Sequence, residues 1–494
     1  MADISRRKFI KGSTAMAISA SMFLVGCGGG GTSTSKPVNT TPNNNNNNNN
    51  PVTSNPNKNL NKSLVYVLLG GGNDSFNMLV PTNTSSYNEY NASRSNLAIA
   101  KNDLLPLNNF TDKNGKTFGL HPSMKKVQTL FNDKKLSFIA NIAPLVEPTN
   151  KTQFNSNSVE LPLGLMSHSD QTKHWQTSNA NERTNIGVLG RFADTFQINK
   201  ANSQVSMNIS LSGTNISQNG VSSKEYSITK DGSIGLKVKE SSNNPAITQL
   251  NNALLDSFNT ILNQNYSDSF EDTFMETTRY AQTHHEKFKT AIDKINITHN
   301  FTSYDSRNDI KFTANDKSIS QQFKMIAKAI KASEDLNLPK QTFFIEYYGW
   351  DHHDELLNNH KRMIEVLSDS LGDFQTSLEE LGVDDKVLTV VGSDFGRTLT
   401  SNGNGTDHGW GGNAIVMGKD VNGGKVFGEY PSLVLNNPLD IGGGVIIPTL
   451  STDELFAEVA LWFGIEKNEL SKLLPNLTNF YSLNNPNNPI GFLS

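Results

Sequence analysis

Four segments of this 494-residue sequence carry side chains that can bind a metal ion or do acid–base and nucleophilic chemistry. They are residues 71–77, 166–174, 349–360 and 393–412. Asp and His are ligands that zinc and related metals prefer, and a serine near a histidine can form an activated nucleophile. These residue types therefore indicate a metal-assisted or nucleophilic reaction.

The strongest of these segments reads Gly-Trp-Asp-His-His-Asp-Glu and starts at Gly349. Asp351 follows an apolar run, so it lies at a predicted strand exit. His353 and His360 are seven residues apart, which puts them two turns apart on one face of an expected helix. Carboxylate and imidazole together predict a metal site. The alternative is a solvated polar helix start.

The segments after the first two predicted strands are less specific. Asp74 closely follows consecutive glycines and could ligate a hard cation, although a turn with a helix N-cap explains this segment better when it is taken alone. Ser167, His168 and Ser169 form a candidate nucleophile site, at which a helix N-terminus would stabilise an anion. A capped helix start with surface histidines is the alternative there.

The last segment combines a possible anion-binding arginine with a glycine-flanked Asp-His pair. Arg397 could fork onto a phosphate or a sulfate. Glycines on both sides of Asp407 and His408 would let the backbone approach a bound group closely. The alternative is a Gly-rich lid held by an ordinary ion pair.

The elements that must position these segments alternate between strands and helices. Apolar runs predict buried strands over residues 64–69, 136–142, 342–347, 386–391 and 413–417. Helices are predicted over residues 123–132 and about 354–381, and a capping box opens another at 451–462. This is the pattern of an α/β fold with a mostly parallel sheet, in which sites form where strands end.

Residues 204–296 follow a different pattern. Polar and apolar residues alternate over 204–240, with Asn-Gly and Asp-Gly turn pairs, which predicts antiparallel β-hairpins. Residues 245–296 are predicted to be helical. We interpret both as an insertion over about 185–300, a β-hairpin and helical subdomain that covers part of the sheet.

The N-terminus has the pattern of an export signal. Arg6 and Arg7 precede a short, mildly apolar stretch that is too short for a membrane span, which needs about 20 apolar residues. We interpret residues 1–27 as a twin-arginine signal peptide. Its end, Leu-Val-Gly-Cys, resembles a bacterial lipobox and predicts lipidation of Cys27. The alternatives are a basic cytoplasmic terminus, or an ordinary signal in which Cys27 is incidental.

Cys27 is the only cysteine, so the mature body has no disulfide framework. Residues 28–61 are rich in Asn, Gly and Ser, which predicts a disordered tether before a body over 62–494. The formal net charge of −4 argues against nucleic acid as a partner. The expected partners are a membrane, through the lipid, and the twin-arginine translocase. The expected location is the periplasmic side of a membrane or the cell surface.

Taken together, the motifs resemble those of the DUF1501 family. The resemblance rests on Leu-Gly-Gly-Gly-Asn-Asp-Ser-Phe-Asn from Leu69, Gly-Leu-His-Pro from Gly119, Ser167-His168, the segment from Gly349, and the two segments that start at Ser393 and Gly405. Those proteins are exported and described as sulfatase-like, and they are similar to the alkaline phosphatase superfamily. The resemblance implies an alkaline-phosphatase-like fold, a sheet sandwiched by helices, and a metal-dependent hydrolase of phosphate or sulfate esters.

The resemblance also implies roles for individual residues. The metal ligands would be Asp74, Asp351, His353, Asp394 and His408, holding a divalent ion such as zinc. Ser167 matches the nucleophile, with Ser169 as the next candidate, and Arg397 or a second metal would stabilise the ester oxygens.

One ligand position departs from the superfamily pattern, because Phe395 stands where a histidine is expected after Asp394. His121, His168 and His360 are candidates to replace it, and Asp407 is a further candidate in the site. The departure also supports an alternative of another class, a surface-anchored binding protein that keeps the fold without catalysis. The long tether suggests a third reading, a surface-assembly factor.

Overall fold

The protein is described by a computed structural model that defines residues 61–196, 205–235, 243–304 and 311–494. The predicted signal peptide, Cys27 and nearly all of the predicted tether lie outside these residues. The described residues all belong to one compact unit. Among the helices of the described part, none is both long and apolar enough to cross a bilayer.

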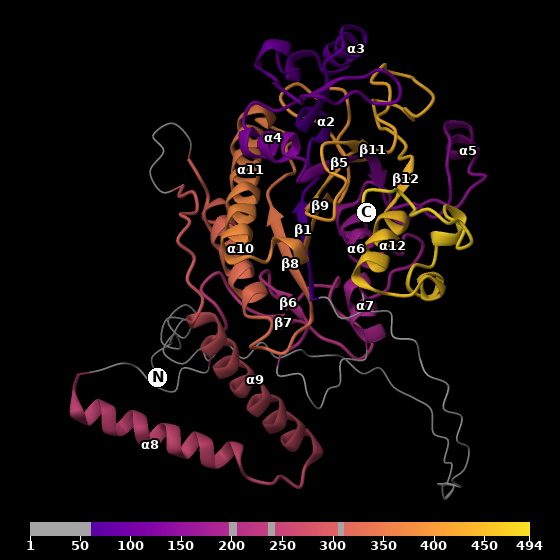
Figure 1. Cartoon of the computed structure of the whole chain (residues 1–494). Coiled ribbons are helices and arrows are strands. Elements are labelled where there is room, and N and C mark those ends of the chain that lie inside the picture. The colour runs from indigo at the N-terminus through magenta and orange to yellow at the C-terminus, as the bar shows by residue number, and fades with distance from the viewer. Residues whose placement is uncertain (1–60, 197–204, 236–242, 305–310) are drawn as a thin grey trace, which may run out of the picture. The chain divides into compact units, whose positions relative to one another are not determined.

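A central sheet forms the core of this unit (Figure 1). Its strands run in the order β11-β5-β10-β9-β1-β8-β6-β7, and β12 also pairs with β5. Only β10 is antiparallel to its neighbours, β5 and β9; the other pairs are parallel. The bounds are β1 (Lys62–Gly70), β5 (Leu136–Ala143), β6 (Asn208–Ser210), β7 (Tyr226–Ser227), β8 (Lys340–Tyr348), β9 (Val387–Ser393), β10 (Gly412–Gly418), β11 (Val426–Phe427) and β12 (Leu450–Ser451).

The five strands predicted from apolar runs are all present, and the mostly parallel sheet is confirmed. β1 lies between β8 and β9, and from Leu64 to Leu69 its side chains are at most 2% exposed. A strand covered on both faces has no solvent side, so a continuous apolar run rather than an alternating one encodes it.

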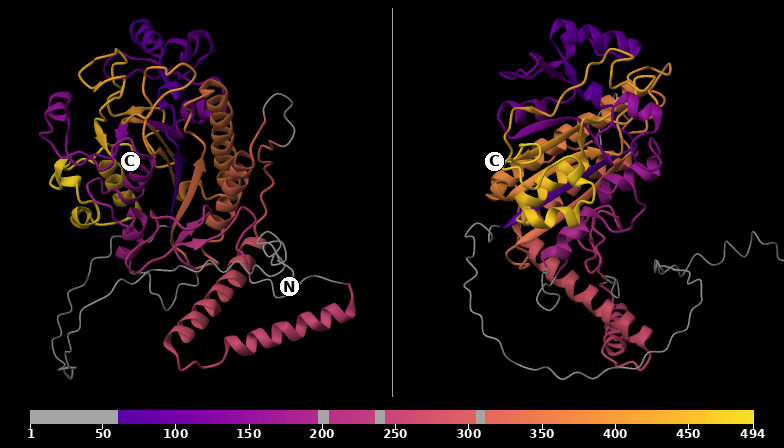
Figure 2. Two further views of the ribbon diagram at one scale, coloured as in Figure 1. Left: turned by 180° about the vertical axis from the view of Figure 1, so that it is seen from behind. Right: turned by 90° about the vertical axis from the view of Figure 1, so that its right-hand side faces the viewer.

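Helices lie on both faces of the sheet, as Figures 1 and 2 show. One layer contains α4 (Lys125–Asn132), α10 (Ala314–Lys331) and α11 (Leu356–Leu381). The other contains α6 (His168–Thr177), α7 (Val188–Phe196) and α12 (Thr452–Phe463). The predicted capping box at the start of α12 is confirmed, since Ser451 and Glu454 exchange hydrogen bonds with each other's backbone.

Smaller elements complete the described chain. A second, antiparallel sheet has the order β2-β4-β3, with bounds β2 (Leu79–Pro81), β3 (Leu105–Pro106) and β4 (Phe118–Leu120). The short helices are α2 (Ser75–Met78), α3 (Thr84–Arg94), α5 (Lys151–Ser156) and α13 (Leu470–Leu473). The 3₁₀ turns are η2 (Ser95–Leu97), η3 (Lys101–Asp103), η4 (Asp384–Lys386), η5 (Lys467–Glu469) and η6 (Leu477–Asn479).

The prediction of antiparallel hairpins over 204–240 is wrong for the described residues. β6 pairs in parallel with β8, and β7 in parallel with β6, so both extend the main sheet. The Asp-Gly pair closes only a local turn, with an isolated bridge between Thr229 and Gly232. Alternation marks a half-buried strand but does not say which strand it pairs with.

The predicted insertion over about 185–300 is also not a separate cover for the sheet. α7 buries Val188, Leu189 and Phe192 in the main core. The helical prediction is confirmed as two helices, α8 (Pro245–Leu262) and α9 (Ser269–Asp293). These two helices project from the amino-terminal end of the sheet rather than lying on its face (Figure 2). Most of their residues are exposed.

Candidate metal centre

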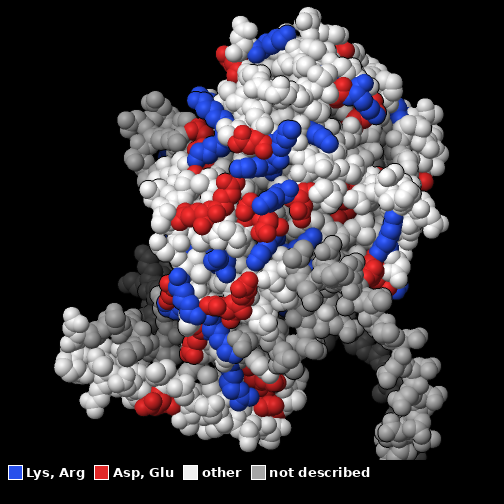
Figure 3. Space-filling view, viewed as in Figure 1, with Lys and Arg blue, Asp and Glu red and all other residues white. Residues whose placement is uncertain are grey.

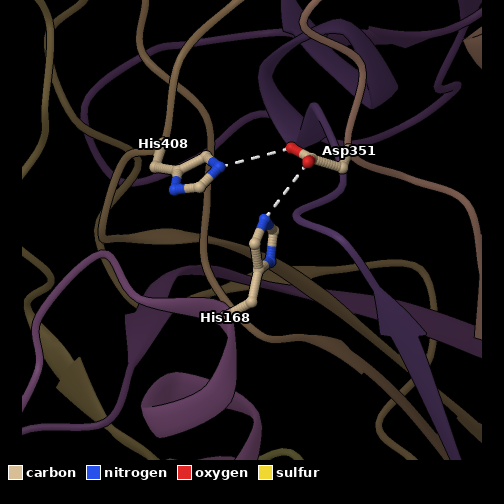
Figure 4. A group of neighbouring side chains, drawn as sticks. All are labelled: His168, Asp351 and His408. Atoms are coloured by element: carbon tan, nitrogen blue, oxygen red, sulfur yellow. Dashed lines mark ion pairs between the residues drawn. The ribbon is translucent and has the colours of Figure 1, made fainter.

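Three side chains from three separate segments of the chain meet beyond the carboxyl ends of β8 and β9 (Figure 4). His168 starts α6, Asp351 follows β8, and His408 lies in the connection from β9 to β10. Their ligand atoms lie within 4.8 Å of one another, a group that could hold a metal ion. The parallel order of the strands explains why these segments emerge at one edge.

Asp351 is the centre of the group. Its Oδ2 atom lies 3.3 Å from Nε2 of His168, and its Oδ1 atom lies 3.3 Å from Nε2 of His408. The side chains of His408, His168 and Asp351 are 27%, 35% and 44% exposed, so the group lies near the protein surface. Buried polar atoms normally have hydrogen-bond partners, but the buried Nε2 atom of His168 has none among the described residues and faces Asp351 only as an ion pair.

Both imidazoles are held from behind at Nδ1. Nδ1 of His168 lies 2.8 Å from Oδ2 of Asp394, and Nδ1 of His408 lies 2.8 Å from the carbonyl oxygen of Met166. An acceptor at Nδ1 favours the tautomer whose Nε2 lone pair is free for a metal. Histidines that bind metals usually donate their other ring N–H to a carboxylate or a carbonyl oxygen in this way. Asp394 is 1% exposed and accepts hydrogen bonds from the backbone N–H of Gly71.

Met166 takes an unusual backbone conformation to make its contact. Its φ of +66° lies in the left-handed region, which non-glycine residues seldom adopt. Strain of this kind persists only where the surrounding structure enforces it, and it is often found at functional sites. Nothing in the sequence points to Met166, because a backbone carbonyl and a positive φ leave no signal in the residue type.

His353 and Arg397 contact the same carboxylate. Nε2 of His353 lies 3.0 Å from Oδ1 of Asp351 and 3.0 Å from Nε2 of His408. Nδ1 of His353 lies 3.2 Å from Oδ1 of Asp407. Nη1 of the fully buried Arg397 donates to Oδ1 of Asp351 at 2.7 Å. The predicted site residues Asp351, His353, Asp407 and His408 therefore share one centre, and Arg397 supports it.

The protonation states of Asp351 and His408 suit a cation, whereas a proton on His168 competes with one. Burial would raise the pKa of Asp351, but the hydrogen bond and charge of Arg397 outweigh burial and lower it. Burial lowers the pKa of His408, so this imidazole stays neutral and available. The hydrogen bond to Asp394, supported by the charges of both carboxylates, raises the pKa of His168. A proton on Nε2 of His168 therefore occupies a place that a metal ion could take.

Asp74 is not brought into this group. Its carboxylate is fully buried and pairs with Arg94 at the end of α3. Burial raises the pKa of Asp74, and the charge of Arg94 opposes that effect without cancelling it. In this structure the Asp74 side chain connects α3 to the loop after β1. The sequence offered no signal for this pairing, since Arg94 stood in no recognised motif.

His121 and His360 also lie apart from the centre. Both are buried, with ring centroids 5.3 Å apart, and Nε2 of His360 lies 3.0 Å from Oδ1 of Asn73. The expectation that His353 and His360 share a helix face is wrong. α11 begins only at Leu356, so His353 belongs to the preceding loop; its side chain is 43% exposed, whereas His360 is buried.

Ser167 and Ser169 flank His168 in the sequence, at the start of α6. Oγ of Ser167 lies 3.1 Å from Oγ of Ser169, and the residue of the turn that joins the group is His168. His168 is thus the candidate that supplies an imidazole next to Asp394. The ring of Phe395 lies 4.7 Å from the rings of both His168 and His408, so it forms an apolar wall under them.

Comparisons with known proteins give a family and several distant folds. The sequence model of a family described as "Protein of unknown function (DUF1501)" matches residues 61–474. Among curated proteins, none matches the sequence significantly. Among solved structures, the chain is similar to the lipoteichoic acid synthase LtaP from Listeria monocytogenes, with 10% identity over 88% of this chain and 80% of that chain and a TM-score of 0.33.

A second similar structure is the PsFucS1 sulfatase from Pseudoalteromonas sp. Its identity is 9% over 83% of this chain and 68% of that chain, and the TM-score is 0.32. At this low sequence identity and TM-score, the likeness to these structures assigns no activity to the chain.

Proposed function

This chain belongs to the DUF1501 family, and we propose that it is a metal-dependent hydrolase of phosphate or sulfate esters. The observation that carries the proposal is the convergence of His168, Asp351 and His408, whose ligand atoms lie within 4.8 Å of one another. They come from parts of the chain that only the tertiary fold brings together.

The donor set fits a divalent transition metal, and we propose zinc. Two imidazoles and a carboxylate with an open position make up a common type of catalytic zinc site. His353 lies 3.0 Å from both Asp351 and His408 and is a further donor. A divalent ion bound there would polarise an ester oxygen and lower the pKa of a bound water.

The chain's own residues would orient this chemistry. Asp394 fixes the ring of His168, and Arg397 holds Oδ1 of Asp351. Asp407 lies 3.2 Å from Nδ1 of His353 and would orient that ring so that its Nε2 atom can act as the further donor. The first amides of α6 lie beside His168, and helix N-termini favour anions such as a phosphate or sulfate.

Ser167 remains the proposed nucleophile, although its hydroxyl bonds with Ser169 in this structure. A Ser167→Ala variant distinguishes attack on the ester by Ser167 from direct attack by water. Loss of turnover with retained metal would indicate a covalent intermediate on Ser167. Retained turnover would indicate direct attack by water.

We further propose that the protein is exported by the twin-arginine route and anchored through a lipid on Cys27. The support is the sequence pattern of residues 1–27 and the polar tether over 28–61. The catalytic body would then work on the periplasmic side of a membrane or at the cell surface. A Cys27→Ser variant should move the protein from the membrane fraction to the soluble fraction.

The central experiment compares metal content and esterase activity in the purified chain. Zinc-loaded wild type should hydrolyse nitrophenyl phosphate or nitrophenyl sulfate. Asp351→Ala and His408→Ala should lose the metal. Asp394→Asn should weaken metal binding about 10–100-fold, because Asp394 orients the ring of His168. His299→Ala is the matched control, because His299 pairs with Asp373 at another surface.

Two results would contradict the proposal in different ways. A wild-type chain that holds no ion after titration with zinc, manganese or magnesium has no metal centre. A chain that holds the ion but hydrolyses neither ester is a metal-binding protein without this activity, which is the non-catalytic alternative.

A further inference from the structure

The α8–α9 hairpin, residues 245–293, exposes large apolar side chains along both of its helices. Such side chains are normally buried, and contiguous exposed groups of them mark interaction surfaces. On α8 the exposed fractions are 42% for Ile247, 59% for Leu250, 49% for Leu254 and 46% for Ile261; on α9 they are 85% for Phe270 and 62% for Phe274.

The exposed residues of α8 form one stripe. Ile247, Leu250, Leu254 and Ile261 follow one another at three, four and seven residues, spacings that stay on one helix face. The sequence of α8 has a single charged residue, Asp256, and no Lys or Arg. Figure 3 shows the same contrast, because α8 is almost entirely white while charges of both signs are spread over the body.

The hairpin is attached at the amino-terminal end of the sheet. In α9 the buried residues are Phe288, Ala291 and Ile292, all in its last two turns. The ring of Phe288 packs 5.7 Å from that of Tyr226 in β7. β7 extends the sheet through β6, which pairs with the first half of β8.

This end of the sheet is also where the body's chain begins. Lys62 starts β1 and pairs with Lys340 at the start of β8, whereas the metal centre lies beyond the opposite, carboxyl ends of the strands. In Figure 1 the hairpin and the start of β1 both lie at the lower end of the molecule.

We propose that the apolar stripe of α8 rests in the interfacial region of a lipid bilayer rich in zwitterionic lipids. The length of chain before the body argues for this occupant. Residues 28–61 separate the body from the predicted lipid on Cys27, and their length and composition correspond to an end-to-end distance of roughly 30 Å. The tether would thus hold this end of the sheet close to a membrane.

The composition of α8 selects the type of lipid. Peripheral helices that bind anionic lipids carry Lys and Arg on their polar face, and α8 has neither. Its binding must come from burial of apolar area. With the hairpin at the membrane, the metal centre faces away from the bilayer, toward dissolved substrates.

The test measures the polarity around a single labelled position in the full chain. Cys27→Ser removes the only cysteine and the lipid site together. Leu254→Cys in that background, labelled with a polarity-sensitive fluorophore, reports on the hairpin. Val434→Cys is the matched control, since Val434 is 47% exposed in a loop between β11 and β12.

With phosphatidylcholine vesicles, the label at position 254 should shift to the blue, brighten several-fold and be quenched by lipid-borne quenchers. The label at position 434 should not change. Leu250→Ser with Leu254→Ser should weaken vesicle binding about tenfold, whereas Val434→Ser with Leu435→Ser should not.

Two outcomes would overturn the proposal. A blue shift that needs no vesicles and grows with protein concentration means that a second copy of the chain covers the face. No shift under any condition means that the hairpin does not enter lipid. Because the readout needs neither lipidation nor ester hydrolysis, either outcome leaves the proposed function to be decided by its own experiment.

Discussion

At the residue scale, the centre depends on how two imidazoles are oriented. His168 and His408 each present Nε2 to Asp351 because Nδ1 is engaged by Asp394 or by the carbonyl of Met166. The family resemblance leads one to expect a histidine at position 395, next to Asp394. In this protein the imidazole beside Asp394 is that of His168. Phe395 instead provides a wall 2% exposed under both rings.

The place of Phe395 beside both imidazoles predicts the effect of Phe395→His. An imidazole beside Asp394 and close to His168 should form a second ligand group, so the variant should bind more zinc per chain than wild type, measured by elemental analysis. Replacing a buried phenyl ring should also lower the free energy of unfolding by roughly 2 kcal/mol, measured by urea denaturation.

Phe395→Leu is the matched control for this change. It should lose a similar amount of stability without gaining metal. Equal zinc content in the histidine and leucine variants would mean that position 395 cannot contribute a ligand in this fold.

At the scale of elements, buried charges fix how helices join the sheet. The Arg94–Asp74 pair connects α3 to the loop after β1, and Arg94 also donates to the carbonyl oxygens of Thr398 and Leu399 near the centre. At the start of α12, Asp453 is fully buried and accepts hydrogen bonds from the backbone N–H of Asn476 and from Ser451. Such groups favour one arrangement of elements at a cost in desolvation.

Asp453 makes the stability of the protein depend on pH. Burial raises its pKa to about 7, from the ordinary value of 3.8 that applies in the unfolded chain. Between these values the folded state holds a proton that the unfolded state has released. The Asp453 contribution to stability is therefore complete below the lower value and is lost as the pH rises toward 7, by at most about 1.4 kcal/mol per pH unit.

Asp453→Asn should remove this contribution to the pH slope. Relative to wild type, its free energy of unfolding should rise between pH 4.5 and pH 7, measured by urea denaturation at each pH. Asp103→Asn, at an exposed position in η3, is the control and should keep the wild-type slope. An unchanged slope in the Asp453 variant would mean that this carboxyl stays ionised in the folded protein.

At the scale of the molecule, one core carries both the sheet and the centre, and the α8–α9 hairpin stands outside it. The main apolar cluster runs from Leu64 to Leu493, but in α9 it takes in only Phe288, Ala291 and Ile292. Segments that bury few apolar side chains open locally at low free-energy cost.

Chymotrypsin should therefore cut the folded body first within the hairpin, after Phe270 or Phe274. Limited digestion followed by mass spectrometry would locate the first cuts. The two large fragments should stay associated and keep their bound metal, because the sheet and the centre do not depend on the hairpin's tip. First cuts within residues 61–196 would contradict this order of local stability.

The sequence by itself determined the elements and the edge of the sheet where chemistry gathers. Apolar runs such as 64–69 and 136–142 encode strands covered on both faces, and the Ser451–Glu454 box encodes a helix start. These signals act over a few residues, so they can be read locally. They also placed Asp351, Asp394 and His408 after strands, which was enough to predict a metal site.

Only the tertiary structure decided which of the predicted residues meet. His168 joins the centre while His360 packs against His121, and Asp74 pairs with Arg94. Likewise, β6 and β7 extend the sheet in parallel instead of forming hairpins. The physical reason is that contacts between distant segments depend on strand order, register and loop direction, which are set by the packing of the whole core and not by any local pattern of residues.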